Sequence, residues 1–166
     1  MSLRALLPLI LSLGLPAAAA AQAQVPFAGL GTDPAAPVEL AAESLAVDQA
    51  AGTADFQGDV LVVQGDMRLA ADRVQVTYAE DPATGRTRIA RLHATGGVTL
   101  VTPADAAEAA EAVYDLDARR ITLTGDVVLT QGGSALAGDR LVIELDSRTG
   151  RMEGRVRSVI LPDDRP

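Results

Sequence analysis

Apolar and polar residues alternate in short runs along most of the chain after residue 37. Val74, Val76 and Tyr78 are separated by polar residues, and Ile121 and Leu123 flank a threonine in the same way. A period of two is typical of a β-strand that buries one face. Comparable runs recur at short spacing, at residues 38–40, 45–47, 60–62, 98–100, 114–116, 127–129, 141–145 and 156–160. The pattern predicts an all-β protein of short antiparallel strands.

Glycine-containing clusters between these runs predict the turns. Residues 81–86 and 146–151 have the composition of hairpin loops, with a glycine available for a positive φ angle. We also interpret Gly58-Asp59 and Gly125-Asp126 as turns, because each precedes an alternating run. Residues 103–112 differ, since their Ala, Glu and early Pro favour a helix. They lack a large apolar face, so a short helix and a loop both remain open for this segment.

Two long segments of the chain have similar sequences and form an internal repeat. Residues 47–78 align with residues 114–145 without a gap. The identical pairs are Asp48/Asp115, Ala51/Ala118, Gly58/Gly125, Asp59/Asp126, Val60/Val127, Gln64/Gln131, Gly65/Gly132, Leu69/Leu136, Ala70/Ala137, Asp72/Asp139 and Arg73/Arg140. Such an internal repeat is typical of stacked-sheet or solenoid-like architectures. Its apolar positions share one face, which is either an ordinary filled core or an interior partly open to an apolar ligand.

The first residues predict export. Arg4 precedes an apolar run at residues 5–15, and an alanine tract follows Pro16, as in a cleavable secretory signal. The run is shorter than the ~20 residues that span a bilayer, which disfavours the alternative of a retained anchor. Cleavage after Ala21 or after Ala23 fits equally well. We expect a signal peptide at 1–23, a flexible leader at 24–36, one domain at 37–162 and a tail at 163–166, with the mature protein exported.

Composition argues against catalysis and against nucleic acid. The chain has no cysteine, a single histidine (His93) and a net charge of −8. This residue set does not supply the ligands of a zinc site, and a strongly acidic chain does not attract a polyphosphate backbone. No serine lies in a nucleophile motif, and no helix follows the glycine pairs. We therefore expect no enzyme, no metal and no cofactor.

Several runs resemble the OstA/LptA family of periplasmic lipopolysaccharide-transport proteins. Residues 37–40 (Pro-Val-Glu-Leu), 56–60, 63–65 and 69–74 resemble the first half of the family, and residues 114–116, 123–127, 138–141 and 155–162 resemble its second half. Each motif alone is only a turn with a strand. Their order and spacing, together with the signal peptide, make the resemblance specific over roughly residues 37 to 162.

The resemblance implies a protein located in the periplasm, with a V-shaped, slightly twisted β-jellyroll whose apolar interior receives the acyl chains of lipid A. It also implies a bridge between inner and outer membranes, made by head-to-tail pairing with further copies, with an LptC-like inner-membrane partner and with an LptD-like outer-membrane translocon. Residues 38–40 would lie at one mouth, and residues 156–161 would form the terminal pairing strand. At matching positions the groove would be lined by Val38, Leu40, Phe56, Val60, Val62, Val74, Val76, Leu100, Tyr114, Leu116, Leu123, Leu129, Leu141 and Ile143.

The chain also departs from the family pattern. Many relatives carry lysines and a basic tail, whereas every basic residue here is arginine and the chain ends Asp163-Asp164-Arg165-Pro166. We therefore assign no residue to lipid phosphates. Two alternatives remain beside lipopolysaccharide transport: an envelope β-solenoid scaffold with a filled core, and a secreted carbohydrate-active protein. The lack of an aromatic or carboxylate platform disfavours the latter.

Overall fold

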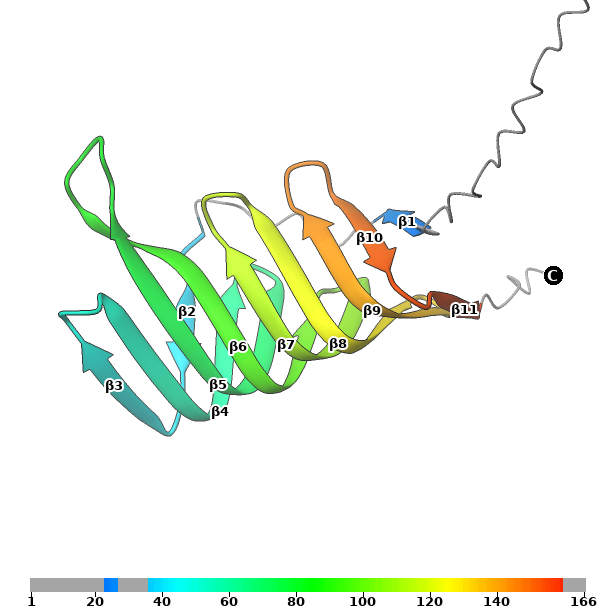
Figure 1. The fold of residues 1–166 in the computed structure, drawn as a ribbon, viewed down its shortest axis with the longest axis horizontal. Helices are drawn as coiled ribbons and strands as arrows, with labels where there is room; N and C mark the ends of the chain where they lie inside the picture. The colour runs from blue at the N-terminus through cyan, green and yellow to red at the C-terminus, as the bar shows by residue number, and fades with distance from the viewer. Residues whose placement is uncertain (1–22, 27–35, 160–166) are drawn as a thin grey trace, which may run out of the picture.

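The computed structural model describes residues 23–26 and 36–159, and their regular structure is entirely β, as predicted (Figure 1). One 11-stranded sheet contains all the strands, and every pair is antiparallel. The strands are β1 (Ala23–Pro26), β2 (Glu39–Ala41), β3 (Ser44–Asp48), β4 (Thr53–Gln64), β5 (Met67–Glu80), β6 (Thr87–Val101), β7 (Asp105–Asp115), β8 (Arg120–Gln131), β9 (Ser134–Glu144), β10 (Thr149–Glu153) and β11 (Arg157–Val159).

Consecutive long strands pair as a meander from β4 to β9. At each end of the sheet, two short strands share one long strand: β2 and β3 both pair with β4, and β10 and β11 both pair with β9. The outer edge of β10 pairs with β1. Figure 1 shows β2 and β3 at one end of the sheet, and β1, β10 and β11 at the other.

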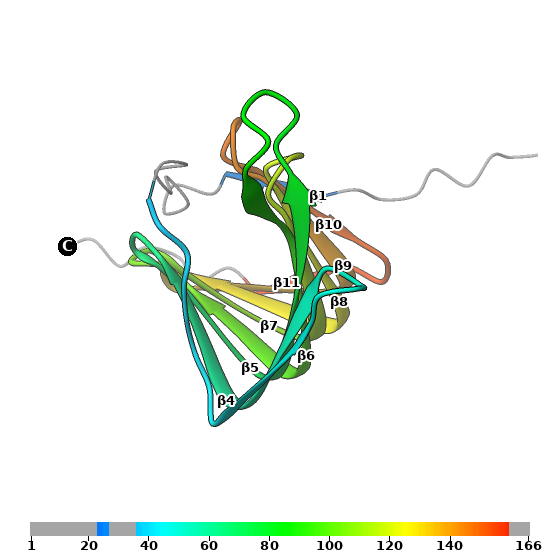
Figure 2. The same ribbon diagram turned by 90° about the vertical axis from the view of Figure 1, so that its left-hand side faces the viewer.

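The sheet is folded lengthwise into two arms, because each of the five strands β4 to β8 is interrupted near its middle by a shift of register. Figure 2, which looks along the sheet, shows the arms as the two sides of a V. Arm A consists of β1, β3, β10 and residues 53–57, 73–80, 87–95, 111–115, 120–124 and 140–144. Arm B consists of β2, β11 and residues 60–64, 67–70, 98–101, 105–109, 127–131 and 134–138.

The Gly-Asp pairs are not turns between strands, which corrects the sequence prediction. Gly58 and Asp59 lie inside β4 with φ angles of 83° and 44°, and Gly125 and Asp126 lie inside β8 with 89° and 46°. Two successive left-handed residues bend a strand without ending it, as a β-bulge does. The same composition serves a hairpin turn and a bulge, so sequence alone did not separate them. The actual hairpin turns include Gly65 and Gly132.

Residues 105–115 form strand β7, so neither the helix nor the loop considered for 103–112 is correct. Ala107, Ala109 and Ala112 point into the V and are at most 9% exposed, while Glu108 faces outward. Ladders with β6 on one side and β8 on the other hold the segment extended. Strand preference depends on such neighbours more than on the residue itself, and here the neighbours override the helical preference of alanine.

The apolar face of every long strand points between the arms and forms a single core. Val74, Val76, Ile121, Leu123 and Leu141 in this core have no exposed surface. The charged residues that alternate with them lie outside, as the period-two pattern predicted.

The signal peptide and its cleavage site, together with residues 27–35 and 160–166, lie outside the described residues. Residues 23–26, part of which we placed in a flexible leader, form β1. The proposed domain boundaries otherwise remain a prediction. Within residues 23–26 and 36–159 there is no helix with the length and hydropathy needed to cross a membrane.

Candidate functional site

The fourteen predicted groove residues all belong to one apolar cluster between the arms. Ten of them are at most 3% exposed: Val60, Val62, Val74, Val76, Leu100, Tyr114, Leu123, Leu129, Leu141 and Ile143. The other four, Val38, Leu40, Phe56 and Leu116, are partly buried against the same cluster. The structure thus brings the whole set together. Its role in binding a lipid stays a prediction.

Sequence reasoning left several members of the interior out of the predicted groove. Met67 and Met152 are both at most 1% exposed, at the start of β5 and in β10. Ala107, Ala109 and Ala112 supply the inner face of β7. The alternation of alanine with Glu108 and Glu111 was a usable signal for the alanines. Single methionines beside turns gave no periodic signal.

The two arms are joined by a polar contact at the open side of the V. The hydroxyl group of Tyr114 in arm A donates to Oε1 of Gln64 at the end of β4 in arm B, 3.0 Å away. Nε2 of Gln64 donates to the carbonyl oxygen of Ala36 at 3.2 Å. Burial raises the pKa of the Tyr114 hydroxyl above its ordinary value, so this group remains a neutral donor.

Further buried polar groups lie along the rim of arm B, where β6 turns into β7. Asp105 and Thr102 are 5% and 8% exposed. The Thr102 hydroxyl accepts from the backbone N–H of Asp105, and Nε2 of Gln131 donates to Oδ1 of Asp105 at 2.7 Å. Oδ2 of Asp105 has no hydrogen-bond partner among the described residues. At this rim, the hydrogen-bond acceptor oxygens of Thr102 and Asp105 lie at the border of the apolar interior.

Charged pairs bridge neighbouring strands on the outer face of arm A. Arg73 of β5 contacts Asp55 of β4 at 2.6 Å, and Arg120 of β8 contacts Glu144 of β9 at 2.7 Å. The hydrogen bond from Arg73 lowers the pKa of the Asp55 carboxyl. Exposed pairs of this kind contribute about 0–1 kcal/mol each, so they add little to the stability of the fold.

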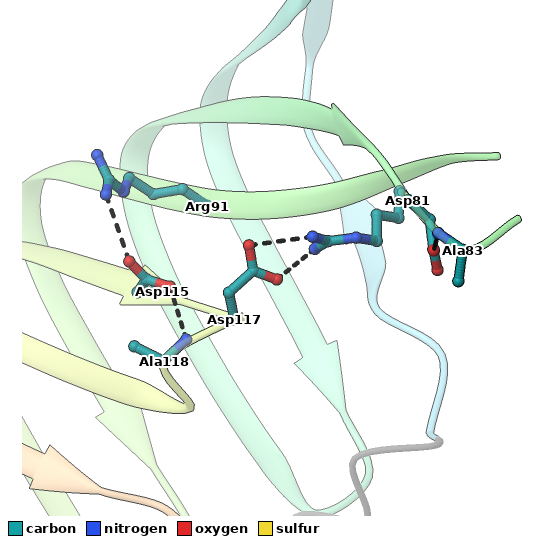
Figure 3. A network of polar contacts seen from close by, with 7 residues as sticks. Asp81, Ala83, Arg91, Asp115, Asp117 and Ala118 are labelled. Carbon is teal, nitrogen blue, oxygen red and sulfur yellow. Dashed lines mark hydrogen bonds and ion pairs between the residues drawn. The ribbon is translucent and has the colours of Figure 1, made fainter. Parts of the chain in front are cut away.

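The β7–β8 turn at the rim of arm A holds a compact polar network (Figure 3). The carboxylate of Asp115 accepts from the backbone N–H of Ala118 at 2.9 Å and from Arg91 at 3.3 Å. The hydrogen bond from Ala118 is the main reason that the pKa of Asp115 is lowered. Arg88 binds both carboxylate oxygens of Asp117, which ties this turn to β6.

Apolar side chains are exposed at the two ends of the sheet. Leu45 and Val47 of β3 are 56% and 61% exposed, although they pair with the inward-facing Phe56 and Ala54 of β4. They continue the apolar interior past the last long strand, and none of the other described strands pairs with β3 on its outer side. At the opposite end, Val159 of β11 is 63% exposed.

The described residues contain no group of three His, Asp or Glu side chains that could hold a metal ion. His93 lies near Glu111, with 3.3 Å between Nε2 and Oε2, on the outer face of arm A. An apolar interior bordered by hydrogen-bonding groups can hold an amphiphile.

A lengthwise-folded antiparallel sheet around one continuous apolar interior defines the class of the protein: a V-shaped, slightly twisted β-jellyroll. Residues 39–149 match the family described as "LptA/(LptD N-terminal domain) LPS transport protein". This match covers well over half of the chain, and the chain belongs to that family, as its sequence motifs indicated.

Two relatives illustrate the similarity. A protein of Rhizobium meliloti (strain 1021), described as "Uncharacterized protein R00383", is 27% identical over 136 residues, which span 78% of this chain and 73% of the relative. The crystal structure of LptH from Pseudomonas aeruginosa, described as the LptA homologous periplasmic component of the lipopolysaccharide transport device, superposes with a TM-score of 0.69. That alignment covers 79% of this chain and 99% of LptH at 19% identity, so it bears on the fold alone.

Proposed function

We propose that this protein carries lipopolysaccharide across the periplasm with the lipid A acyl chains held between the two arms. In this role it links an LptC-like inner-membrane partner to an LptD-like outer-membrane translocon. Family membership supports the general role, and export of the chain would place it in the periplasm. The observation that carries the proposal is the continuous apolar interior from Val38 and Leu40 at one end to Ile143 near the other.

The physical advantage of such an interior is large. Each CH₂ group of an acyl chain exposed to water costs roughly 0.8 kcal/mol. A trough lined by Val and Leu side chains removes that cost without any reaction at this protein. The absence of aromatic residues other than Phe56, Tyr78 and Tyr114 from the described chain leaves an interior shaped by aliphatic groups, which suits flexible acyl chains.

A scaffold without a ligand is the second candidate, and one observation favours it. Ten of the predicted groove residues are at most 3% exposed, so the interior is packed as a closed core. A carrier must therefore open, whereas a scaffold need not.

Photo-crosslinking separates these two functions. A photoreactive phenylalanine analogue replaces Phe56, which is partly buried in the cluster, or Leu129, which is 1% exposed. The matched controls are Gln57 and Val128, the next residues on the opposite faces of the same strands. In cells, we expect lipopolysaccharide adducts at Phe56 and Leu129 only. Equal labelling of both faces, or of neither, in variants with unchanged circular dichroism would leave the scaffold as the better account.

We further propose that copies associate head to tail through the ends of the sheet. The exposed backbone edges of β2 and β3 at one end and of β11 at the other can add strands, and Leu45 and Val47 offer apolar surface there. The β10 edge, in contrast, is covered by the chain's own β1.

Truncation tests this association. Removing residues 157–166 deletes β11 but leaves Val156 packed against the core. We expect the concentration-dependent oligomers seen by light scattering to disappear, while circular dichroism stays unchanged. Removing only residues 160–166, which keeps β11, is the control and should retain the oligomers. Oligomers that survive both truncations would show that β11 is not the pairing strand.

A further inference from the structure

The contact between Tyr114 of β7 and Gln64 of β4 joins two strands that are not neighbours in the sheet. Tyr114 pairs through its backbone with Leu92 and Ile121 in arm A, whereas Gln64 pairs with Met67 in arm B. The two residues are fifty positions apart in the chain and lie in no common ladder. Together with the carbonyl group of Ala36, they form a chain of two hydrogen bonds that we call the clasp.

Both side chains of the clasp are buried, each 3% exposed. A buried amide or hydroxyl group without a partner carries a desolvation penalty, so each group depends on the other. Gln64 lies on the same face of β4 as Val60 and Val62, both of which are 1% exposed. The polar contact therefore closes the rim directly beside the apolar interior.

We propose that the clasp holds the two arms closed over the apolar interior. The hydrogen bond between the Tyr114 hydroxyl and Oε1 of Gln64 breaks when the arms part to admit acyl chains. This inference rests on the proposed function. In a closed core of this kind, parting the arms at the Gln64 rim separates these two atoms, since one belongs to each arm. Apolar packing opposes the parting of the arms in proportion to the apolar area that becomes exposed. The clasp adds a hydrogen bond, which is directional and is either formed or broken.

The chemistry of the clasp also indicates the ligand class. When Tyr114 withdraws, Oε1 of Gln64 is left as a buried acceptor without a donor. A hydroxyl or amide N–H group beside the acyl chains can replace the tyrosine hydroxyl and remove that penalty. The preferred ligand is thus an amphiphile that carries a neutral hydrogen-bond donor where its apolar chains begin. A simple hydrocarbon lacks such a donor and would leave Gln64 unsatisfied.

Two tyrosines give a matched pair of variants. Tyr114→Phe removes the donor while retaining the ring. Tyr78→Phe makes the same chemical change in β5, where the tyrosine packs partly buried against the same cluster and its hydroxyl makes no hydrogen bond to the described residues. Gln64→Met is a second way to break the clasp with a side chain of similar length.

The distance between the arms can be measured directly, because the chain has no cysteine. Spin labels on cysteines at Asp66 and Ala118, exposed turn residues at the rims of arms B and A, report opening by double electron–electron resonance. We expect Tyr114→Phe and Gln64→Met to increase the ratio of open to closed arms about tenfold, equivalent to ~1.4 kcal/mol. Tyr78→Phe should match the parent chain. Purified lipopolysaccharide should shift the parent chain toward the longer distance.

The outcomes separate the clasp from the proposed function. If both clasp variants keep the parent distance distribution, the clasp is refuted, even where lipopolysaccharide still opens the parent chain. If the clasp variants open while lipopolysaccharide leaves every variant unchanged, the clasp is a real closure but the proposed cargo is wrong. Should Tyr114→Phe fail to fold, Gln64→Met decides the question by the same readout.

Discussion

The fold in the sheet depends on positions where a side chain has no room, and Gly125 is one of them. Its φ angle is 89°, and a Cβ atom built there would lie 2.7 Å from Cβ of Ala110 on the neighbouring strand β7. Gly132, in the β8–β9 turn, has a φ angle of 56° and nothing within 4 Å of the same ideal position. The two glycines therefore share a left-handed backbone but differ in the space available.

The expected costs follow from this difference. Gly132→Ala should lower the free energy of unfolding by about 1–2 kcal/mol, because alanine is strained in the left-handed conformation. Gly125→Ala has a similar conformational cost. It also places the new Cβ atom closer to Cβ of Ala110 than the normal contact distance of about 3.5–4.0 Å, so β7 and β8 must move apart. Such overpacking costs about 1–3 kcal/mol, which gives a total of about 2–5 kcal/mol.

Urea unfolding measures both variants, and Ala110→Gly tests the cause. This second change removes the atom that the new Cβ meets. In a double-mutant cycle, we expect a coupling free energy of about 1–3 kcal/mol between the two changes. Ala110→Gly alone should cost about 0.5–1 kcal/mol, as glycine does in a strand, so the net recovery in the Gly125→Ala background is smaller than the coupling by that amount. The reasoning fails if Gly125→Ala is no more destabilising than Gly132→Ala. It fails equally if the cycle shows no coupling free energy between Gly125→Ala and Ala110→Gly.

Two further variants test the interior and the rim. Leu123→Ala removes a side chain with no exposed surface and should lower the free energy of unfolding by about 2–5 kcal/mol, whereas Val128→Ala, at a site 39% exposed on the same strand, should change it by about 0.5 kcal/mol or less. Asp115→Asn removes a carboxylate whose pKa is lowered in the folded protein, first by the Ala118 N–H. A lowered pKa stabilises the fold above the unfolded value of about 3.9 and loses that effect as pH falls through the folded value. The melting temperature of Asp115→Asn should thus lie below that of the parent at pH 7, and the difference should shrink below about pH 4; a difference that does not change with pH would contradict this account.

The inward and outward faces could be predicted from sequence because a strand has a period of two. Shifting the register by one residue would expose Val60 and Val62 and bury Asp59 and Leu61, so the pattern itself selects one arrangement. The fourteen groove residues that the family resemblance implied follow the same alternation, and all of them fall in one cluster. The internal repeat likewise corresponds to a structural one, since Gly58-Asp59 and Gly125-Asp126 adopt nearly the same φ angles.

What could not be predicted depends on neighbours distant in sequence. The extended form of β7 is enforced by β6 and β8, while its own alanines favour a helix. A Gly-Asp pair fits a hairpin turn as well as a bulge, and only the paired strand decides between them. The bond between Tyr114 and Gln64 requires the V to be folded, because neither residue's local sequence indicates a partner fifty positions away.

A closed interior constrains how a carrier of this shape can work. Exposing one large aliphatic side chain costs about 1.5–3 kcal/mol, while a whole domain is stable by only about 5–15 kcal/mol. Parting the arms along their full length in water would expose Val62, Val76, Leu123, Leu129, Leu141 and Ile143 together. At about 1.5–3 kcal/mol each, these side chains would cost about 9–18 kcal/mol, which is comparable to or larger than that stability. In the proposed role, an acyl chain would therefore replace contacts between the arms as they are lost, starting at the rim. Such an exchange leaves the apolar area exposed to water nearly unchanged at each step, so it does not favour either direction. In the proposed role, directional transport therefore requires energy supplied elsewhere.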